Sequence, residues 1–259
     1  MVRTNTPSLV SNGKPNGSEI MARFGWHFIW SNKYGVLAAA LAFSLYLLTL
    51  APTVMWYDMG EFALVSHVLG VAHPPGYPLY IILGKLFTLL PIGDVAYRVN
   101  LMSAAWGSAT VFLLFLILKM TTRSDFASFL PAMTVAVGST FWSSAIWAEA
   151  HTLNAFLTLL IIYLMSLWRS TGDFRLGYLA FFILGLGLGN HRLILMILPA
   201  AVFFLLLELG RRIPILFWKP LLLLVLFVFF GSLINLYLPF RALQGLAIIS
   251  DDPGSVDGF

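Results

Sequence analysis

Long apolar stretches separated by short polar breaks run through most of the chain and predict membrane-spanning helices. A bilayer hydrocarbon core about 30 Å thick needs roughly 20 apolar residues per helix. The pattern predicts about seven such helices, at residues 34–52, 98–119, 126–146, 151–168, 176–189, 191–208 and 219–240. One further stretch, residues 77–91, is short, is bracketed by prolines and carries Lys85 near its middle. This stretch could cross the membrane or lie along its surface.

The distribution of basic residues decides between these two placements, because Lys and Arg in short loops collect on the cytoplasmic side. If residues 77–91 lie flat, 11 of the 15 Lys and Arg residues fall on that side. If they cross, every later loop changes sides and the asymmetry disappears. Lys85 would then lie within the membrane, at a cost of roughly 2.5–3.5 kcal/mol. We therefore predict seven spans, a cytoplasmic N-terminus and an interfacial helix at residues 77–91.

Composition supports an all-α, polytopic membrane protein. The chain is 59% hydrophobic and 10% charged, against about 45–50% and about 25% in soluble proteins. Its 259 residues leave no room for a separate soluble enzyme domain beside seven spans. The sequence contains no cysteine, which excludes disulfides, thiolate metal sites and a thiol nucleophile. Although the chain is basic, its Lys and Arg residues are scattered at span ends, so we expect no nucleic-acid partner.

These patterns predict three regions. Residues 1–33 are polar and lack the apolar middle of a signal peptide, so we expect a disordered cytoplasmic tail. Residues 34–249 form the transmembrane module, with a large outer loop at 53–97. Residues 250–259 form a tail on the outer face, and a truncated continuation is one interpretation of their abrupt end.

With this topology, ionisable side chains from distant parts of the chain converge at the outer face. Polar groups in membrane proteins usually face a cavity or one another, and they mark functional sites. The candidate site residues are Asp58, Glu61, His73, Tyr77, Arg98, Glu149, His151, His191, Arg192 and Arg241.

Asp58 and Glu61 begin a predicted helix at residues 58–70, where they lie about 60° apart on one face. One alternative is a capping box, with Asp58 as N-cap and Glu61 three residues on. The two interpretations are compatible, because the positive helix end would keep Asp58 ionised and able to accept a proton. A divalent metal ion held by Asp58, Glu61 and His67 is less favoured, since His67 lies about 180° from Asp58. We expect no certain cofactor.

The segment HPPGYPLY, residues 73–80, forms a stiff elbow, because its prolines disfavour helix and its glycine permits positive φ. We expect this elbow to aim His73 and Tyr77 back toward the carboxylates. His73 could hold an anionic group or make an ordinary interfacial hydrogen bond. For Arg98, at the outer start of a span, a snorkelling arginine is the favoured interpretation on its own.

Two further clusters lie at outer helix junctions. Glu149 and His151 interrupt an apolar hairpin, which favours a functional role over a structural one. His191 and Arg192 follow a glycine-rich run, and Arg241 follows Tyr-Leu-Pro-Phe. Because a guanidinium offers a fork of donors to phosphate oxygens, both arginines could bind a lipid phosphate.

These motifs, in this order, resemble a known family. An acidic pair after the first span is followed by H-P-P-G-Y-P-L-Y, R-V-N, F-W-S with a later Glu and L-N, G-N-H, and Y-L-P with a later Arg. The chain is similar, from about residue 34 to its end, to a membrane family long labelled a domain of unknown function. That family includes an animal protein O-mannosyltransferase and belongs to the GT-C glycosyltransferase superfamily.

The resemblance implies an inverting enzyme that moves a sugar from a polyprenyl-phosphate donor to a protein or glycan acceptor hydroxyl at the outer or lumenal face. It implies two juxtamembrane helices in the first outer loop. The matching catalytic base is Asp58, with Glu61 assisting. His73, Arg192, Arg241 and Arg98 would stabilise the departing phosphate, while Glu149, His151, His191 and Tyr77 would bind sugar or phosphate.

Two other functions stay open. A transporter of lipid-linked sugars is less favoured, because such proteins hold substrate at the midplane between repeated halves, and this sequence shows no internal repeat. A non-catalytic membrane subunit of a larger complex, with partner chains in the membrane, is motivated by the abrupt end at residue 259. Membrane lipid is an expected partner in every case.

Overall fold

The computed structural model describes residues 27–55, 58–212 and 218–244 of the chain, without the side chains of residues 208–218. The chain divides between Lys33 and Tyr34 into two units. In the first unit, residues 27–31 are helical, and the side chains of Ser31 and Asn32 donate hydrogen bonds to the carbonyl of Phe28. Most of the predicted disordered tail, residues 1–26, and the predicted tail at 250–259 lie outside the described residues.

Helices account for the regular structure of the described residues, which confirms the predicted all-α class. The α-helices are α2 (Lys33–Leu48), α3 (Met59–Val68), α4 (Pro78–Thr88), α5 (Val95–Thr122), α6 (Asp125–Val137), α7 (Ser139–Ala145), α8 (Ala150–Thr171), α9 (Phe174–Gly187), α10 (Leu198–Arg212), α11 (Trp218–Ser232) and α12 (Tyr237–Leu243). Two 3₁₀ helices, η1 (Arg192–Ile197) and η2 (Leu233–Leu236), precede α10 and α12.

In the described part of the chain, three helical segments are long and apolar enough to cross a membrane. These are α5, α8 and the continuous segment Lys219–Leu243, which runs through α11, η2 and α12. Other apolar helices, among them α2, α6 and α9, have 10–17 residues. The protein is therefore an all-α membrane protein, while the number of crossings and their orientation stay predictions.

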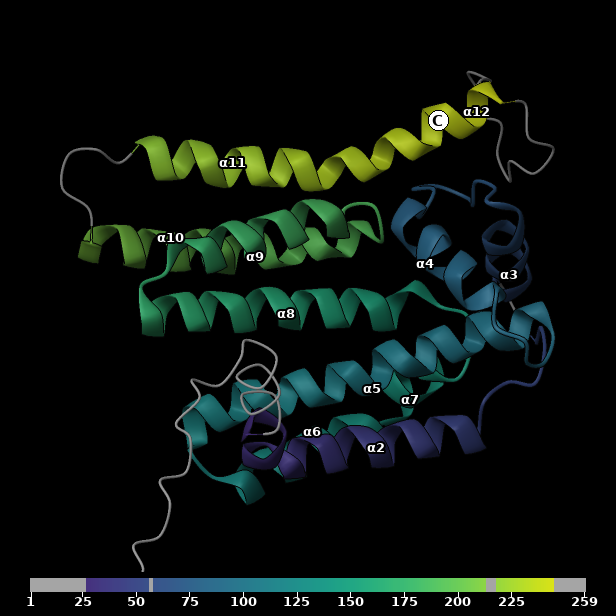
Figure 1. The fold of residues 1–259 in the computed structure, drawn as a ribbon, viewed down its shortest axis with the longest axis horizontal. Helices are drawn as coiled ribbons and strands as arrows, with labels where there is room; N and C mark the ends of the chain where they lie inside the picture. Colours follow the sequence, from purple (N-terminus) through teal and green to yellow (C-terminus); the bar gives the residue numbers. More distant parts are fainter. Residues whose placement is uncertain (1–26, 56–57, 213–217, 245–259) are drawn as a thin grey trace, which may run out of the picture. The chain divides into compact units, whose positions relative to one another are not determined.

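The helices α8, α9 and α11 lie side by side, with α5 against α8 and α6 (Figure 1). Close approach of α9 and α11 depends on two glycines. A Cβ atom on Gly185 would overlap the carbonyl oxygen of Val228, and one on Gly231 would lie 2.7 Å from the backbone nitrogen of Leu186. Small residues allow this backbone contact, which is common where membrane helices pack.

Two predicted spans are interrupted. The predicted helix at 126–146 breaks at Gly138, whose extended backbone (φ −62°, ψ 128°) separates α6 from α7. The predicted helix at 191–208 begins with the six residues of η1 before α10. Apolar periodicity runs through both breaks, so the pattern alone predicted continuous helices.

Residues 53–97, the predicted outer loop, contain the two helices α3 and α4. Their predicted place beside the membrane on its outer face stays a prediction. Helix α4 has 11 residues, so it extends only about 16 Å at 1.5 Å per residue. It is therefore too short to cross a hydrocarbon core of about 30 Å by itself. Its buried residues include Tyr80, Ile81 and Gly84, and it packs against α3 and α5.

Candidate functional site

The turn after α3 brings the histidine of the elbow back to the carboxylates at the start of that helix. Helix α3 ends at Leu69, which adopts a left-handed conformation (φ 57°). In the elbow, Gly76 (φ 92°) and Tyr77 (φ 48°) are also left-handed, and the peptide bond between Pro74 and Pro75 is cis. The chain reverses direction before α4. His73 faces Glu61 and Asp58, as predicted for the elbow, and the hydroxyl of Tyr77 lies beside His73.

Glu61 and His73 form a doubly hydrogen-bonded pair. The backbone N–H of His73 donates to Oε1 of Glu61 at 2.7 Å, and its ring Nδ1 lies 2.7 Å from Oε2. Because a carboxylate only accepts, Nδ1 carries the proton, and Nε2 faces the other way. Nε2 lies 3.2 Å from the hydroxyl of Tyr77 and 3.9 Å from Oδ2 of Asp58. Glu61 therefore sets both the orientation and the tautomer of a ring that faces Asp58.

The capping-box alternative does not form. Asp58 occupies the N-cap position of α3, but its side chain makes no capping hydrogen bond, and it is exposed. The side chain of Glu61 binds His73 instead of the start of the helix. Asp58 is thus an exposed carboxylate beside the Glu61–His73 pair.

These three residues also offer the donor atoms for a divalent cation. One ligand atom from each of Asp58, Glu61 and His73 lies within 4.8 Å of the others. The predicted metal alternative named His67 in place of His73, but His67 is exposed in the last turn of α3 and is absent from this group. A cation held by Asp58 and Nε2 of His73 would leave Glu61 as the outer partner that orients the imidazole, a common arrangement at metal sites.

A second cluster, from α8 and the loop before η1, adjoins the first. Nε2 of His151 lies 3.8 Å from Oε2 of Glu149. The ring centroids of His151 and His191 are 5.5 Å apart, and those of His191 and Tyr77 are 5.7 Å apart. Since the rings of Tyr77 and His73 are 5.1 Å apart, aromatic and imidazole side chains connect the two acid–histidine pairs.

Burial and charge perturb the ionisation of this joined site. Burial, followed by the charges of Asp58 and Glu149, raises the pKa of Tyr77 to about 12. Burial also raises the pKa of Glu149, although His151 opposes this effect. The pKa of His191 is lowered by burial and by the neighbouring histidines. Ionisable side chains with shifted pKa values that come together from separate segments are typical of functional sites.

A hydrogen bond also favours the neutral form of His191. Its Nδ1 accepts the backbone N–H of Leu193 at 3.0 Å, which caps η1. An accepting Nδ1 carries no proton, so Nε2 is the N–H donor of the neutral ring. The residue thus offers a donor on the side that does not bind the helix.

Buried amides hold the loops of the site, and the sequence pattern did not predict this role. The Nδ2 of Asn100 donates to the carbonyl of Ala51 at 2.9 Å, and that of Asn190 donates to the carbonyl of Ala150 at 3.1 Å. Both asparagines are about 1% exposed or less. Burying a polar side chain is costly unless it is hydrogen-bonded. An asparagine inside an apolar run could therefore have indicated a buried amide that binds backbone.

The structure places the three predicted arginines differently. Arg192 is exposed at the start of η1, near enough to Tyr77 to act on the pKa of its phenol. Arg98 donates three hydrogen bonds to the carbonyls of Thr88, Ile92 and Gly93, which closes the loop after α4. No contact between Arg98 and the acid–histidine pairs is found among the described residues, so substrate binding by it stays a prediction.

Arg241, from α12, closes the end of α3. Its Nε donates to the carbonyl of Leu69 at 2.7 Å, and Nη2 donates to that of Val68 at 3.0 Å. The neighbouring Tyr237 donates its hydroxyl to the carbonyl of Gly70 at 2.8 Å. Helix α12 therefore holds the turn that positions His73. Phosphate binding by Arg241 stays a prediction.

Comparison with known proteins agrees with this arrangement. Residues 58–212 match the model of the protein O-mannosyl-transferase TMEM260 N-terminal domain, and this range begins at Asp58 and includes both acid–histidine pairs. The chain belongs to the TMEM260 N-terminal domain family. This membership confirms the predicted resemblance to a family with an animal O-mannosyltransferase. Of the predicted site residues, Arg241 alone lies outside the matched range.

Two curated relatives are both named as protein O-mannosyl-transferases. The mouse protein O-mannosyl-transferase TMEM260 is 35% identical over 161 residues, which is 60% of this chain and 23% of the relative. The Dictyostelium discoideum protein O-mannosyl-transferase tmem260 is 29% identical over 187 residues, 64% of this chain and 22% of the relative. The chain thus spans about a quarter of the length of these relatives. No solved structure matches the chain.

Proposed function

We propose that this chain carries the catalytic residues of a membrane glycosyltransferase that moves mannose from a polyprenyl-phosphate donor to a hydroxyl of a protein acceptor. The observation that carries the proposal is the exposed carboxylate of Asp58, 3.9 Å from a histidine whose other nitrogen is held by Glu61. The relatives are named as protein O-mannosyl-transferases, which supports the choice of mannose as the sugar and a protein as the acceptor.

In this scheme, Asp58 accepts the proton of a serine or threonine hydroxyl as the hydroxyl oxygen attacks the anomeric carbon. The bond between that carbon and the phosphate oxygen breaks, and the phosphate leaves with the electron pair. Attack from the face opposite the phosphate inverts the anomeric configuration. General-base catalysis of this kind is worth about 10²- to 10⁴-fold in rate.

The remaining residues bind and orient. Glu61 holds the ring of His73 so that its Nε2 faces Asp58, the proposed proton acceptor. Arg192 and the Nε2–H of His191 provide donors for the leaving phosphate, whose developing charge they stabilise. Glu149 and His151, at the start of α8, bind sugar hydroxyls. The site faces the lumen or the cell exterior, in keeping with the distribution of Lys and Arg.

Transfer by the purified full-length protein tests this proposal. The substrates are polyprenyl-phosphate mannose and a serine- and threonine-containing peptide, and the variant is Asp58→Asn. Asp94→Asn is the matched control, because Asp94 is an N-cap at the start of α5 and asparagine caps as well as aspartate. We expect Asp58→Asn to bind the donor and to transfer about 10²- to 10⁴-fold more slowly.

Three other outcomes would contradict the scheme. An Asp58→Asn protein that transfers at the rate of Asp94→Asn would remove the base. Donor binding by the wild-type protein without any transfer would favour a non-catalytic subunit. Movement of donor lipid between the leaflets of vesicles, without an acceptor, would favour a transporter.

A further inference from the structure

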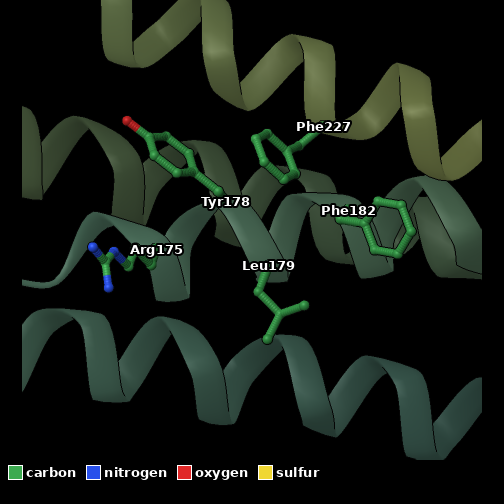
Figure 2. A pocket seen from close by; sticks show the side chains of 5 residues that line it. All are labelled: Arg175, Tyr178, Leu179, Phe182 and Phe227. Atoms are coloured by element: carbon green, nitrogen blue, oxygen red, sulfur yellow. The ribbon is translucent and has the colours of Figure 1, made fainter.

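A groove lies between α9 and α11 and extends from the first turn of α9, the end of that helix farther from the candidate site, to Phe182. It has a volume of about 350 Å³ and is lined by Arg175, Tyr178, Leu179, Phe182 and Phe227. Figure 2 shows the guanidinium of Arg175 and the hydroxyl of Tyr178 toward one end of the groove and Phe182 toward the other. The surface of the groove itself is apolar, and these two polar groups lie beside one end, its polar end.

The shape of the groove follows from the side chains along the two helices. At Gly185 and Gly231 the backbones touch, whereas nearer the start of α9 the rings of Tyr178 and Phe227 stand between the helices. These rings stack with centroids 5.3 Å apart and planes 13° apart. The stacked rings thus lie one to two helical turns before the close backbone contact, and they form part of the lining of the groove.

Charge distinguishes the polar end. Arg175 is exposed in the first turn of α9, and its guanidinium has no ion pair or hydrogen bond with the described residues. Arg169, in the last turn of α8, and Lys219, in the first turn of α11, add positive charge at the same helix ends. Asp173 is the acidic residue of the α8–α9 connection and caps α9 by accepting the backbone N–H of Arg175.

We propose that this groove binds an anionic phospholipid, with the phosphate on Arg175 and the hydroxyl of Tyr178, and an acyl chain along Leu179, Phe182 and Phe227. A guanidinium beside an apolar groove complements both parts of such a lipid. Helix α9 has 14 residues, so Arg175 lies about 20 Å along the helix axis from the candidate site. The lipid therefore comes from the leaflet opposite that site and is distinct from the sugar donor.

Lipid retention by the full-length protein tests the proposal. The protein is delipidated in detergent and mixed with dioleoyl phosphatidylglycerol or dioleoyl phosphatidylcholine, and bound lipid is counted by native mass spectrometry. One favourable contact of a basic residue with an anionic headgroup predicts an affinity about fivefold higher for phosphatidylglycerol. Helical circular dichroism of each variant shows that it is folded.

Three variants separate charge from shape. Arg175→Gln should abolish the preference for phosphatidylglycerol, and Leu179→Trp, which fills the groove, should lower binding of both lipids. Arg123→Gln is the matched control, because Arg123 is also exposed and follows another helix, α5. It should keep the preference.

Each contrary result overturns the proposal. Equal retention of the two lipids by the wild-type protein would show that the headgroup is not recognised. Equal loss in Arg175→Gln and Arg123→Gln would show only diffuse attraction. Unchanged binding by folded Leu179→Trp would show that the acyl chain lies elsewhere.

Discussion

Replacing Glu61 with glutamine tests the pairing on which the candidate site depends. The carboxylate accepts two hydrogen bonds of 2.7 Å from His73, and its side chain is 20% exposed. Hydrogen bonds to a charged group contribute about 1.5–3 kcal/mol, against about 0.5–1.5 kcal/mol for neutral pairs. Because two such bonds weaken, we expect Glu61→Gln to lower the free energy of unfolding by about 2 kcal/mol.

The larger effect is on the tautomer of His73. If the amide oxygen of the new glutamine side chain accepts the backbone N–H of His73, its NH₂ group faces the ring Nδ1 of His73. That nitrogen then has to accept a hydrogen bond and cannot carry the proton. The ring proton moves to Nε2, which then acts as a donor toward the hydroxyl of Tyr77 at 3.2 Å and presents an N–H to Asp58 at 3.9 Å. A wrong tautomer beside a reacting group lowers rates strongly, so we expect mannose transfer to fall by about 10²-fold or more.

Two measurements check this reasoning. The transfer rate is compared with that of Asp94→Asn, which removes a carboxylate from another helix start. The ¹⁵N spectrum of labelled histidine reports which nitrogen of His73 carries the proton. A Glu61→Gln protein that transfers as fast as Asp94→Asn, with Nδ1 of His73 still protonated, would refute the assignment.

Further predictions concern the supports of the site. Arg241→Gln removes the charged donors from the end of α3, and we expect a loss of about 2–3 kcal/mol in unfolding free energy, measured by denaturant unfolding in detergent; unchanged stability would contradict this role. Gly231→Ala places a Cβ atom against the carbonyl oxygen of Phe182, so we expect overpacking to cost about 1–3 kcal/mol, read from the same unfolding curves; an equally stable variant would show that the helices can separate freely. Burial raises the pKa of Glu149, so its charge opposes folding once the pH exceeds its ordinary value of 4.5. Wild-type thermal stability should therefore fall as pH rises from there through the raised pKa, and Glu149→Gln should lack this component; parallel pH profiles for the two proteins would argue against it.

Several features followed from the sequence alone, because they depend on local chemistry or on composition. Apolar runs of about 20 residues predicted helices, since a lipid environment requires internally bonded backbone. The prolines and glycine of residues 73–80 predicted the elbow, because these residue types restrict or permit particular φ values. The order of the motifs was enough to indicate the family.

Other features depended on contacts between segments that are far apart in the sequence, and the pattern of apolar and polar residues does not show that these segments meet. His67 is nearer to the carboxylates along the chain than His73 is. The turn that begins at the left-handed Leu69 nevertheless brings His73, and not His67, to Glu61. A carboxylate near the start of a helix can cap it or bind elsewhere, and the partner across the turn determined which occurs for Glu61.

The arginines show the same division. Their positions near helix ends were visible in the sequence, and phosphate binding was a reasonable expectation for each. The backbone carbonyls that Arg98 and Arg241 bind are exposed only when helices end nearby in space, so tertiary structure decided where those guanidinium groups lie. Local sequence determined which elements form, and the packing of distant elements decided which polar groups meet, because a side chain's partner depends on distance in space and not along the chain.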